Sequence, residues 1–144
     1  MDKEEVYITK GSEETQNLGQ LFAKKLKNKE FIALYGNLGS GKTTFIQGLA
    51  KGLGIKRRII SPTFIIIRSY KLDKKNFYHI DLYRTKSIND LLSVGLDEVI
   101  QKRSSIIALE WAEKMEGLLP KKRTELYFKY IDENTREIKI KKYE

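Results

Sequence analysis

Apolar side chains recur along the chain at spacings that predict alternating helices and strands. Residues Leu18, Leu21, Phe22 and Leu26 lie at the spacing of one helix face. Ser12 stands just before this segment and is followed by two acids, so we expect Ser12 to cap the helix and the acids to favour its first turn.

Short continuous apolar runs predict buried strands. Residues 31–35 form such a run and lead directly into Gly36. Residues 45–53 then return to helical spacing, and Gly54 is typical of a helix end. Further strands are predicted at 64–67, 77–82 and 106–109, with a turn at 70–75 and a short helix that starts at Ser87 and stops at Gly95.

The C-terminal residues predict a β-hairpin. Residues 125–131 and 137–142 alternate around the polar segment 132–135, so we expect this part of the chain to be antiparallel. Helices and strands alternate in the first half, whereas strands dominate the second. The pattern predicts one α/β domain over residues 1–144, a sandwich of helices around a mixed central β-sheet.

Composition excludes several kinds of site. The 144 residues contain no Cys and one His, which removes disulfide frameworks, thiol catalysis and multi-histidine metal sites. No apolar run, Phe64–Ile67 included, is long enough to span a bilayer, and residues 2–5 are all charged, so we expect no membrane segment and a cytoplasmic protein.

The chain is strongly basic. Its 28 Lys and Arg against 19 Asp and Glu give a formal charge of +9. Such a charge attracts nucleic acid or another polyanion, but it also suits a lysine-rich solvated surface. Charge alone does not separate these two readings.

Residues 36–43 carry the chemistry. Gly36-Asn37-Leu38-Gly39-Ser40-Gly41-Lys42-Thr43 matches the P-loop pattern G-x-x-x-x-G-K-[ST], and Thr44 follows it. Glycines let successive backbone amides turn toward a phosphate, and a helix that begins near Lys42 points its positive end at the same anion. Lys42 would reach the β and γ phosphates, and Thr43 would offer a hydroxyl to Mg²⁺. We therefore predict a site for a nucleoside triphosphate with Mg²⁺.

Two acids at strand ends are candidates for the metal and for catalysis. Asp81 ends one predicted strand and Glu110 ends another. Ligands of α/β folds bind at the carboxyl edge of the sheet, where both acids would project. Spacing does not say which acid serves the metal and which activates water.

Four further features have two readings each. Ser61-Pro62-Thr63 is either a nucleotide-sensing loop or an ordinary turn, and Arg84 either binds an anion or lies exposed. His79 is expected to be a hydrogen-bonded core residue rather than a catalytic one. Trp111 is either core or an aromatic surface for a ligand or partner.

Taken together, the P-loop, Ser61–Phe64, Tyr78–Arg84 and Leu109-Glu110-Trp111 resemble the TsaE (YjeE) family, ATPases of tRNA threonylcarbamoyladenosine biosynthesis. The resemblance implies a P-loop α/β fold that binds ATP or ADP with Mg²⁺ and hydrolyses ATP weakly alone. It also implies partners, TsaB and TsaD, which transfer a threonylcarbamoyl group to adenosine 37 of tRNAs that read ANN codons, so tRNA is contacted indirectly or through the complex.

The resemblance also implies roles for single residues. The phosphates fall on Gly39 to Thr43 with Lys42 central, and Mg²⁺ falls on Thr43 and Glu110. Asp81 takes a position like that of a Walker B acid, and Trp111 lies beside the metal-binding acid. Thr63 falls in a switch-like loop, and residues around Thr9 help to hold the nucleotide base.

Two other functions fit the same motif. A small-molecule kinase would need an acceptor site and a lid, for which residues 86–103 are the candidate, and would transfer phosphate to a metabolite. A basic RNA-binding module with a structural nucleotide would bind tRNA without partners and would tolerate Lys42→Ala.

Overall fold

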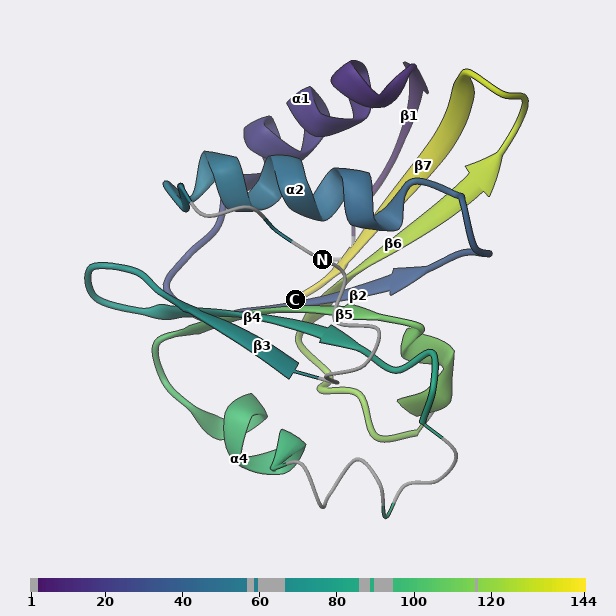
Figure 1. Ribbon diagram of the computed structural model, residues 1–144. Helices are drawn as coiled ribbons and strands as arrows, with labels where there is room; N and C mark the ends of the chain where they lie inside the picture. The colour runs from purple at the N-terminus through teal and green to yellow at the C-terminus, as the bar shows by residue number, and fades with distance from the viewer. Residues whose placement is uncertain (1–2, 57–58, 60–66, 86–88, 90–94, 116) are drawn as a thin grey trace.

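The computed structural model describes residues 3–56, 59, 67–85, 89, 95–115 and 117–144. These residues form one seven-stranded sheet in the order β1-β7-β6-β2-β5-β4-β3, with helices on both faces (Figure 1). The predicted α/β fold with a mixed sheet is confirmed. The elements are β1 (Lys3–Lys10), α1 (Ser12–Ala23), β2 (Glu30–Tyr35), α2 (Lys42–Gly52), β3 (Ile67–Lys71), β4 (Asn76–Asp81), α4 (Leu96–Gln101), β5 (Ser105–Glu110), the 3₁₀ helix η1 (Ala112–Met115), β6 (Arg123–Tyr130) and β7 (Thr135–Tyr143).

The centre of the sheet is parallel and its margins are antiparallel. Strands β6, β2, β5 and β4 run in one direction, while β7, β1 and β3 run against their neighbours. Strands β2, β4 and β5 therefore end at the same edge, where Asp81 pairs in register with Glu110. This parallel register brings the two candidate acids together.

The predicted C-terminal hairpin is confirmed. The expectation that this part of the chain is antiparallel holds for β7 but not for the pairing of β6 with β2. Strand β7 pairs antiparallel with both β6 and β1, whereas β6 pairs parallel with β2. An alternating pattern around a turn shows how two consecutive strands pair. It carries no information on which third strand joins them.

Side chains of the central strands alternate between two cores. Ile32 and Leu34 of β2 pack toward α1 and α2, whereas Phe31 and Ala33 pack on the opposite face, which α4 and η1 cover (Figure 1). Because both faces of these parallel strands are buried, their residues form continuous apolar runs rather than alternating ones.

Helices α1 and α2 approach so closely that glycine is required at their contact. A Cβ at Gly48 of α2 would lie 2.0 Å from the carbonyl oxygen of Gln16 in α1, and one at Gly19 would lie 2.3 Å from that of Phe45. No side chain fits at these distances. The contact fixes α2 against α1, and with it the loop that leads into α2.

Several element ends differ from the predictions. Gly11, not Ser12, precedes α1, and no side chain caps this helix within the described residues. Instead the Glu14 carboxylate turns back and accepts a hydrogen bond of 2.9 Å from the Lys10 amide. Gly54 follows α2 with φ of 89°, as predicted for a helix end.

Two strands depart from what the patterns predicted. Tyr70 and Lys71, expected in a turn, belong to β3, and the turn is confined to residues 72–75. Strand β1 was not expected, because its Val6 and Ile8 are about half exposed and its other residues are mostly charged, so no buried periodicity marks it.

The helix predicted between Ser87 and Gly95 falls mainly outside the described residues. Gly95 itself, with φ of 79°, directly precedes α4. No helix in the part of the chain that the structure describes is long and apolar enough to cross a membrane.

Candidate functional site

The P-loop connects the end of β2 to the start of α2 and is tightly folded. Gly36 follows β2 directly, and a Cβ there would lie 2.7 Å from the Ser40 hydroxyl and 2.8 Å from the carbonyl oxygen of Phe128. Gly41 precedes α2 with φ of 104°, in the left-handed region that side chains disfavour. The two glycines are therefore needed for shape at both ends of the loop.

The start of α2 offers unpaired hydrogen-bond donors. No side chain caps this helix among the described residues, so the amides of its first turn face outward. The buried Ser40 hydroxyl likewise finds no hydrogen-bond partner within that part of the chain. Orphaned donors together with the positive end of a helix fit an anion such as a phosphate.

Lys42 is the first residue of α2 and lies at the same end of this helix. Its side chain is buried, its Nζ donates a hydrogen bond of 2.5 Å to the carbonyl oxygen of Gly36, and the same Nζ lies 3.7 Å from the centre of the Trp111 ring. Burial lowers the pKa of Lys42, against the opposing influence of Glu110, Glu113 and Asp81. A phosphate would replace these partners with a full negative charge.

Thr43 and Glu110 meet across the boundary between α2 and the sheet. The Thr43 hydroxyl donates a hydrogen bond of 3.3 Å to Oε1 of Glu110. The other carboxylate oxygen, Oε2, lies 2.5 Å from Nε2 of His79, which is fully buried. His79 is thus a buried, hydrogen-bonded residue as expected, but its partner is a candidate metal-binding acid, which it holds in orientation toward Thr43.

Asp81 lies next to Glu110 on the neighbouring strand. It is largely buried, and one carboxylate oxygen accepts a hydrogen bond of 2.9 Å from the Tyr83 amide. Arg84 is exposed just beyond this strand. Trp111 follows β5 with φ of 61°, the only non-glycine residue with positive φ among those described, and its ring packs against Tyr83 as well as Lys42. The sequence prediction of an aromatic residue beside the acid agrees with this geometry.

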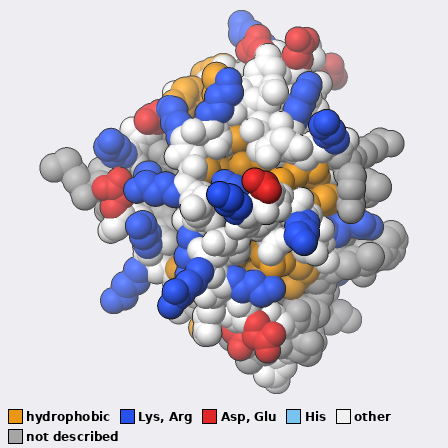
Figure 2. All heavy atoms as spheres, turned by 90° about the vertical axis from the view of Figure 1, so that its left-hand side faces the viewer, with side chains coloured by type: hydrophobic (Ala, Val, Ile, Leu, Met, Phe, Trp, Pro, Cys, Tyr) orange, Lys and Arg blue, Asp and Glu red, His pale blue; other side chains and the backbone are white. Residues whose placement is uncertain are grey.

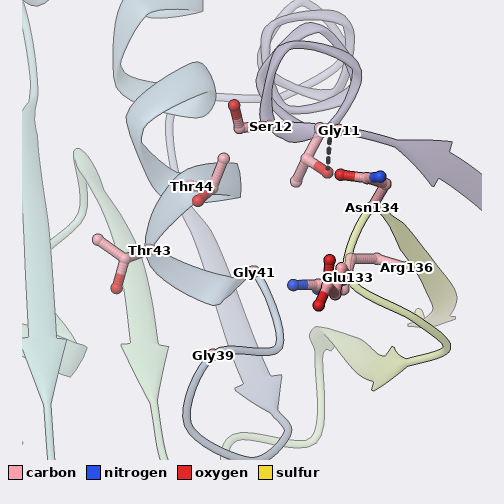
Figure 3. Close-up of a pocket in the computed structure, with 10 residues that line it drawn as sticks. Gly11, Ser12, Gly39, Gly41, Thr43, Thr44, Glu133, Asn134 and Arg136 are labelled. Carbon is pink, nitrogen blue, oxygen red and sulfur yellow. Dashed lines mark hydrogen bonds between the residues drawn. The ribbon is translucent and has the colours of Figure 1, made fainter.

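A cavity of about 390 Å³ opens beside the P-loop (Figure 3). Its walls come from three distant segments: the P-loop and start of α2, the start of α1, and the turn between β6 and β7. In Figure 3, Asn134 lies beside Gly11, and Thr43 points away from them toward the sheet. The lining residues are Gly11, Ser12, Thr15, Gly39, Gly41, Thr43, Thr44, Glu133, Asn134 and Arg136.

The site contains residues that sequence reasoning missed. Arg136 brings a guanidinium to the cavity, held over the Tyr130 ring at 4.5 Å and donating 2.6 Å to the carbonyl oxygen of Asp132. Glu133 and Asn134 lie in the same turn. A polar turn of a hairpin gives no local sign that it faces the P-loop, because only the sheet order places it there.

Thr9 does not line this cavity. It is buried, and its hydroxyl shares a hydrogen bond of 2.7 Å with that of Thr15, which does line it. Thr9 thus supports the wall rather than forming it. Ser61 and Thr63 lie outside the described residues. Within the described ones, no three His, Asp or Glu side chains gather as a metal cluster.

Comparisons with known proteins agree on one family. A sequence model described as "Threonylcarbamoyl adenosine biosynthesis protein TsaE" matches residues 9–138. A protein named tRNA threonylcarbamoyladenosine biosynthesis protein TsaE from Rickettsia typhi is 36% identical over 138 residues, which are 95% of this chain and 94% of that protein. The protein of the same name from Bacillus subtilis is 38% identical over 130 residues, 90% of this chain and 80% of its own. The crystal structure of Bacillus subtilis YdiB superimposes with a TM-score of 0.83 at 33% identity, covering 100% of this chain and 88% of that one.

Proposed function

The chain belongs to the TsaE family of tRNA threonylcarbamoyladenosine biosynthesis proteins, and from this premise we propose that it is the ATP-hydrolysing component of that modification. The observation that carries the proposal is the P-loop with its orphaned amides, Lys42 beside it, and Thr43 joined to Glu110 at 3.3 Å. These groups match the chemistry of a nucleotide polyphosphate with its metal ion.

Each group has a distinct task in this proposal. The P-loop amides bind the phosphates, and Lys42 leaves the Gly36 carbonyl and the Trp111 ring to pair with them. Thr43 and Glu110 hold Mg²⁺, which when bound supplies positive charge to the phosphate oxygens. His79 keeps Glu110 in orientation. Asp81, the adjacent acid, is left to orient the attacking water.

The 390 Å³ cavity would take the nucleoside part of ATP. It is continuous with Gly39 and Gly41 of the P-loop and is closed by Asn134 of the β6–β7 turn and by Arg136 at the start of β7. Arg136 also supplies positive charge beside the P-loop, because its side chain lies 3.7 Å from where a Cβ on Gly41 would be, whereas the sequence offered Arg84 as the anion-binding candidate. The family premise supports TsaB and TsaD as the partners, with threonylcarbamoyl transfer to adenosine 37 of tRNA as the outcome.

The test compares wild type with Lys42→Ala in three measurements. Calorimetry should find ADP and ATP binding in the presence of Mg²⁺ for wild type, and at least a hundredfold weaker binding for Lys42→Ala with an unchanged circular dichroism spectrum. Reconstituted transfer to tRNA with TsaB and TsaD should depend on the wild-type protein and fail with Lys42→Ala. Wild type that binds no adenine nucleotide would overturn the proposal.

The kinase alternative makes a different product. An ATPase releases free phosphate, whereas a kinase transfers phosphate to an acceptor. Incubation with labelled ATP and a metabolite panel should therefore give labelled free phosphate alone. A labelled metabolite would favour the kinase.

A further inference from the structure

Chain segments that are far apart in sequence meet at the edge of the sheet opposite the P-loop. Strands β2, β4, β5 and β6 all begin at this edge because they run parallel. The segments that precede or begin them are residues 24–29, 71–75, 102–103 and 121–123. We call the surface that these four segments form the basic edge.

The four segments of the basic edge are rich in Lys and Arg. Its segments read KKLKNK, KLDKK, KR and KKR, so that Asp73 is their single acid. Figure 2 looks at this side of the molecule and shows Lys and Arg side chains spread widely over it. Lys27, Lys29 and Lys122 form no ion pair with any carboxylate that the structure describes. Two acids, Glu30 and Glu144, line the same groove as these lysines, and the cations outnumber the acids there.

A groove of about 660 Å³ lies within the basic edge. Four lysines line it, Lys27, Lys29, Lys122 and Lys142, together with two acids, Glu30 and Glu144. Its floor is formed by the buried Phe31 and Ile107. Arg123 also lines it and stacks over the Tyr143 ring at 4.6 Å. The cations of this groove offer contacts to phosphates, and the partly exposed Tyr143 ring offers a surface on which a base can stack.

Most cations of the basic edge are lysines, and this favours a nucleic acid over a protein as its partner. Protein interfaces are depleted in Lys at their centres, because its ammonium is costly to desolvate. The phosphate backbone of a nucleic acid is instead bound more tightly with each Lys that contacts it, because each contact releases counterions from the backbone. Asp81 and Glu110, the acids of the proposed nucleotide site, lie at the opposite ends of β4 and β5. Each strand has six residues, which in extended form separate its two ends by about 20 Å.

We propose that the basic edge binds the phosphate backbone of a structured RNA, which under the proposed function is the tRNA that is modified. The inference rests on the proposed function for the identity of the RNA, but not for the chemistry of the surface. Because the two sites lie at opposite edges of the sheet, RNA and nucleotide bind together without overlap.

The test uses two triple variants with equal net charge. Lys27→Ala, Lys29→Ala and Lys122→Ala remove three cations from the basic edge, while Lys10→Ala, Lys129→Ala and Lys139→Ala remove three from β1, β6 and β7. Each lowers the formal charge from +9 to +6, that is 9 − 3. Binding of a transcribed tRNA is measured for the full chain without partners, between 50 and 200 mM salt, with ADP calorimetry on every protein.

Wild type should bind the tRNA with strong salt dependence. The basic-edge variant should bind at least tenfold more weakly at low salt, and its slope of log affinity against log salt should fall by about 2–3 units for three lost phosphate contacts. The control variant should stay within about twofold of wild type. ADP binding should be the same in all three proteins.

Three results would overturn the inference. Equal weakening in both variants would mean that net charge, not the basic edge, attracts RNA. A basic-edge variant that binds tRNA as tightly as wild type would mean that the basic edge is solvated surface. If that variant also failed to bind TsaB or TsaD, the basic edge would be a protein interface. Wild type without measurable tRNA binding would remove the RNA site. Wild type that binds no ADP would instead contradict the proposed function. The tRNA measurement would still test the basic edge.

Discussion

The acidic side chains at the ends of β4 and β5 have different hydrogen-bond partners. Glu110 contacts Thr43 through Oε1 and His79 through Oε2, so both of its oxygens are engaged by groups that orient it. Asp81 on the adjacent strand is held by the Tyr83 amide instead. The two acids are neighbours in register yet have different surroundings, and the proposed function gives them different tasks.

Substitution of the two acids should separate metal binding from water activation. For Glu110→Gln we expect the Mg²⁺ concentration that gives half-maximal ATP hydrolysis to rise about tenfold or more, because a neutral amide is a weaker metal ligand. For Asp81→Asn we expect a lower kcat with the same Mg²⁺ dependence. Hydrolysis rates against Mg²⁺ concentration measure both, with the exposed Glu113→Gln as the control. A Mg²⁺ dependence that shifts with Asp81→Asn alone would exchange the two roles.

Glu125 gives the chain a pH-dependent element away from the nucleotide site. It is buried, and it accepts hydrogen bonds of 2.6 Å from the Tyr127 hydroxyl and 2.8 Å from Nε of Arg123. Burial is the largest influence and raises the pKa of Glu125, but the hydrogen bonds from Tyr127, Arg123 and Tyr35 outweigh it and lower this pKa below 4.5. The ionised form is therefore favoured by folding.

The sign of the resulting stability is fixed by that lowered pKa. The contribution of Glu125 is complete above pH 4.5 and is lost as pH falls through its folded pKa. Glu125→Gln should lower the free energy of unfolding by about 1–3 kcal/mol at pH 7, the range for a hydrogen bond to a charged group. Urea unfolding at pH 7 and pH 3 measures it. The difference between variant and wild type should shrink at pH 3, and a constant difference would contradict the assignment.

Tyr35 makes the same cluster sensitive to alkali. Burial, with the nearby charge of Glu125, raises the pKa of Tyr35 to about 12. A raised tyrosine pKa contributes stability below pH 10 that is lost as pH rises toward 12. Tyr35→Phe should therefore flatten the fall in unfolding temperature between pH 10 and 12. An unchanged alkaline profile would mean that Tyr35 has the same pKa in the folded and the unfolded chain, which contradicts the raised pKa.

Among the helices and strands, the α1–α2 contact positions the site most directly. Gly48 and Gly19 bring the two helix backbones together, and α2 begins at Lys42. A displacement of α2 therefore displaces Lys42 and Thr43. The close contact explains why two glycines stand inside helices that would otherwise gain from alanine.

Gly48→Ala tests this contact. Alanine favours a helix by about 1 kcal/mol over glycine, but its Cβ would lie 2.0 Å from the Gln16 carbonyl oxygen. We expect a net loss of about 2–4 kcal/mol in unfolding free energy, because backbone must move to relieve the clash. Chemical denaturation measures the loss, and ADP affinity should fall as well. Asn17→Ala, at an exposed position of α1, is the control and should be neutral or stabilising. A stabilised Gly48→Ala protein would contradict the close packing.

Under the proposed function, the nucleotide would lie between distant parts of the molecule. The cavity is bounded by residues 11–15, 39–44 and 133–136, so a ligand there joins the start of the chain, the P-loop and the C-terminal hairpin. A ligand that binds only the folded state stabilises it by about 4 kcal/mol at a thousandfold excess over its Kd. For a chain of this size that corresponds to roughly 8–16 °C in Tm.

Mg²⁺ with ADP should therefore raise the thermal unfolding temperature of wild type by about that amount. Lys42→Ala should show little rise, and Arg136→Ala should show a smaller rise than wild type because it removes one wall of the cavity. A thermal scan with and without ADP measures all three. An Arg136→Ala protein that is stabilised as strongly as wild type would remove this turn from the nucleotide site.

Local patterns in the sequence were enough for much of the fold and for the centre of the site. The apolar runs at 31–35 and 106–109 marked strands buried on both faces, and the P-loop pattern marked the turn from β2 into α2. The hairpin was visible from its alternation. Each of these features is local, since it reflects the burial or backbone freedom of residues that are neighbours in the chain.

The remaining features depend on contacts between residues that are distant in the chain. The pairing of Glu110 with Thr43, the arrival of Arg136 at the cavity, and the gathering of lysines from four segments at one edge all follow from the strand order β1-β7-β6-β2-β5-β4-β3. Strand β1 was invisible because β7 holds it by backbone hydrogen bonds that side-chain patterns do not record. Long-range pairing and packing set these distances, and no window along the sequence contains them.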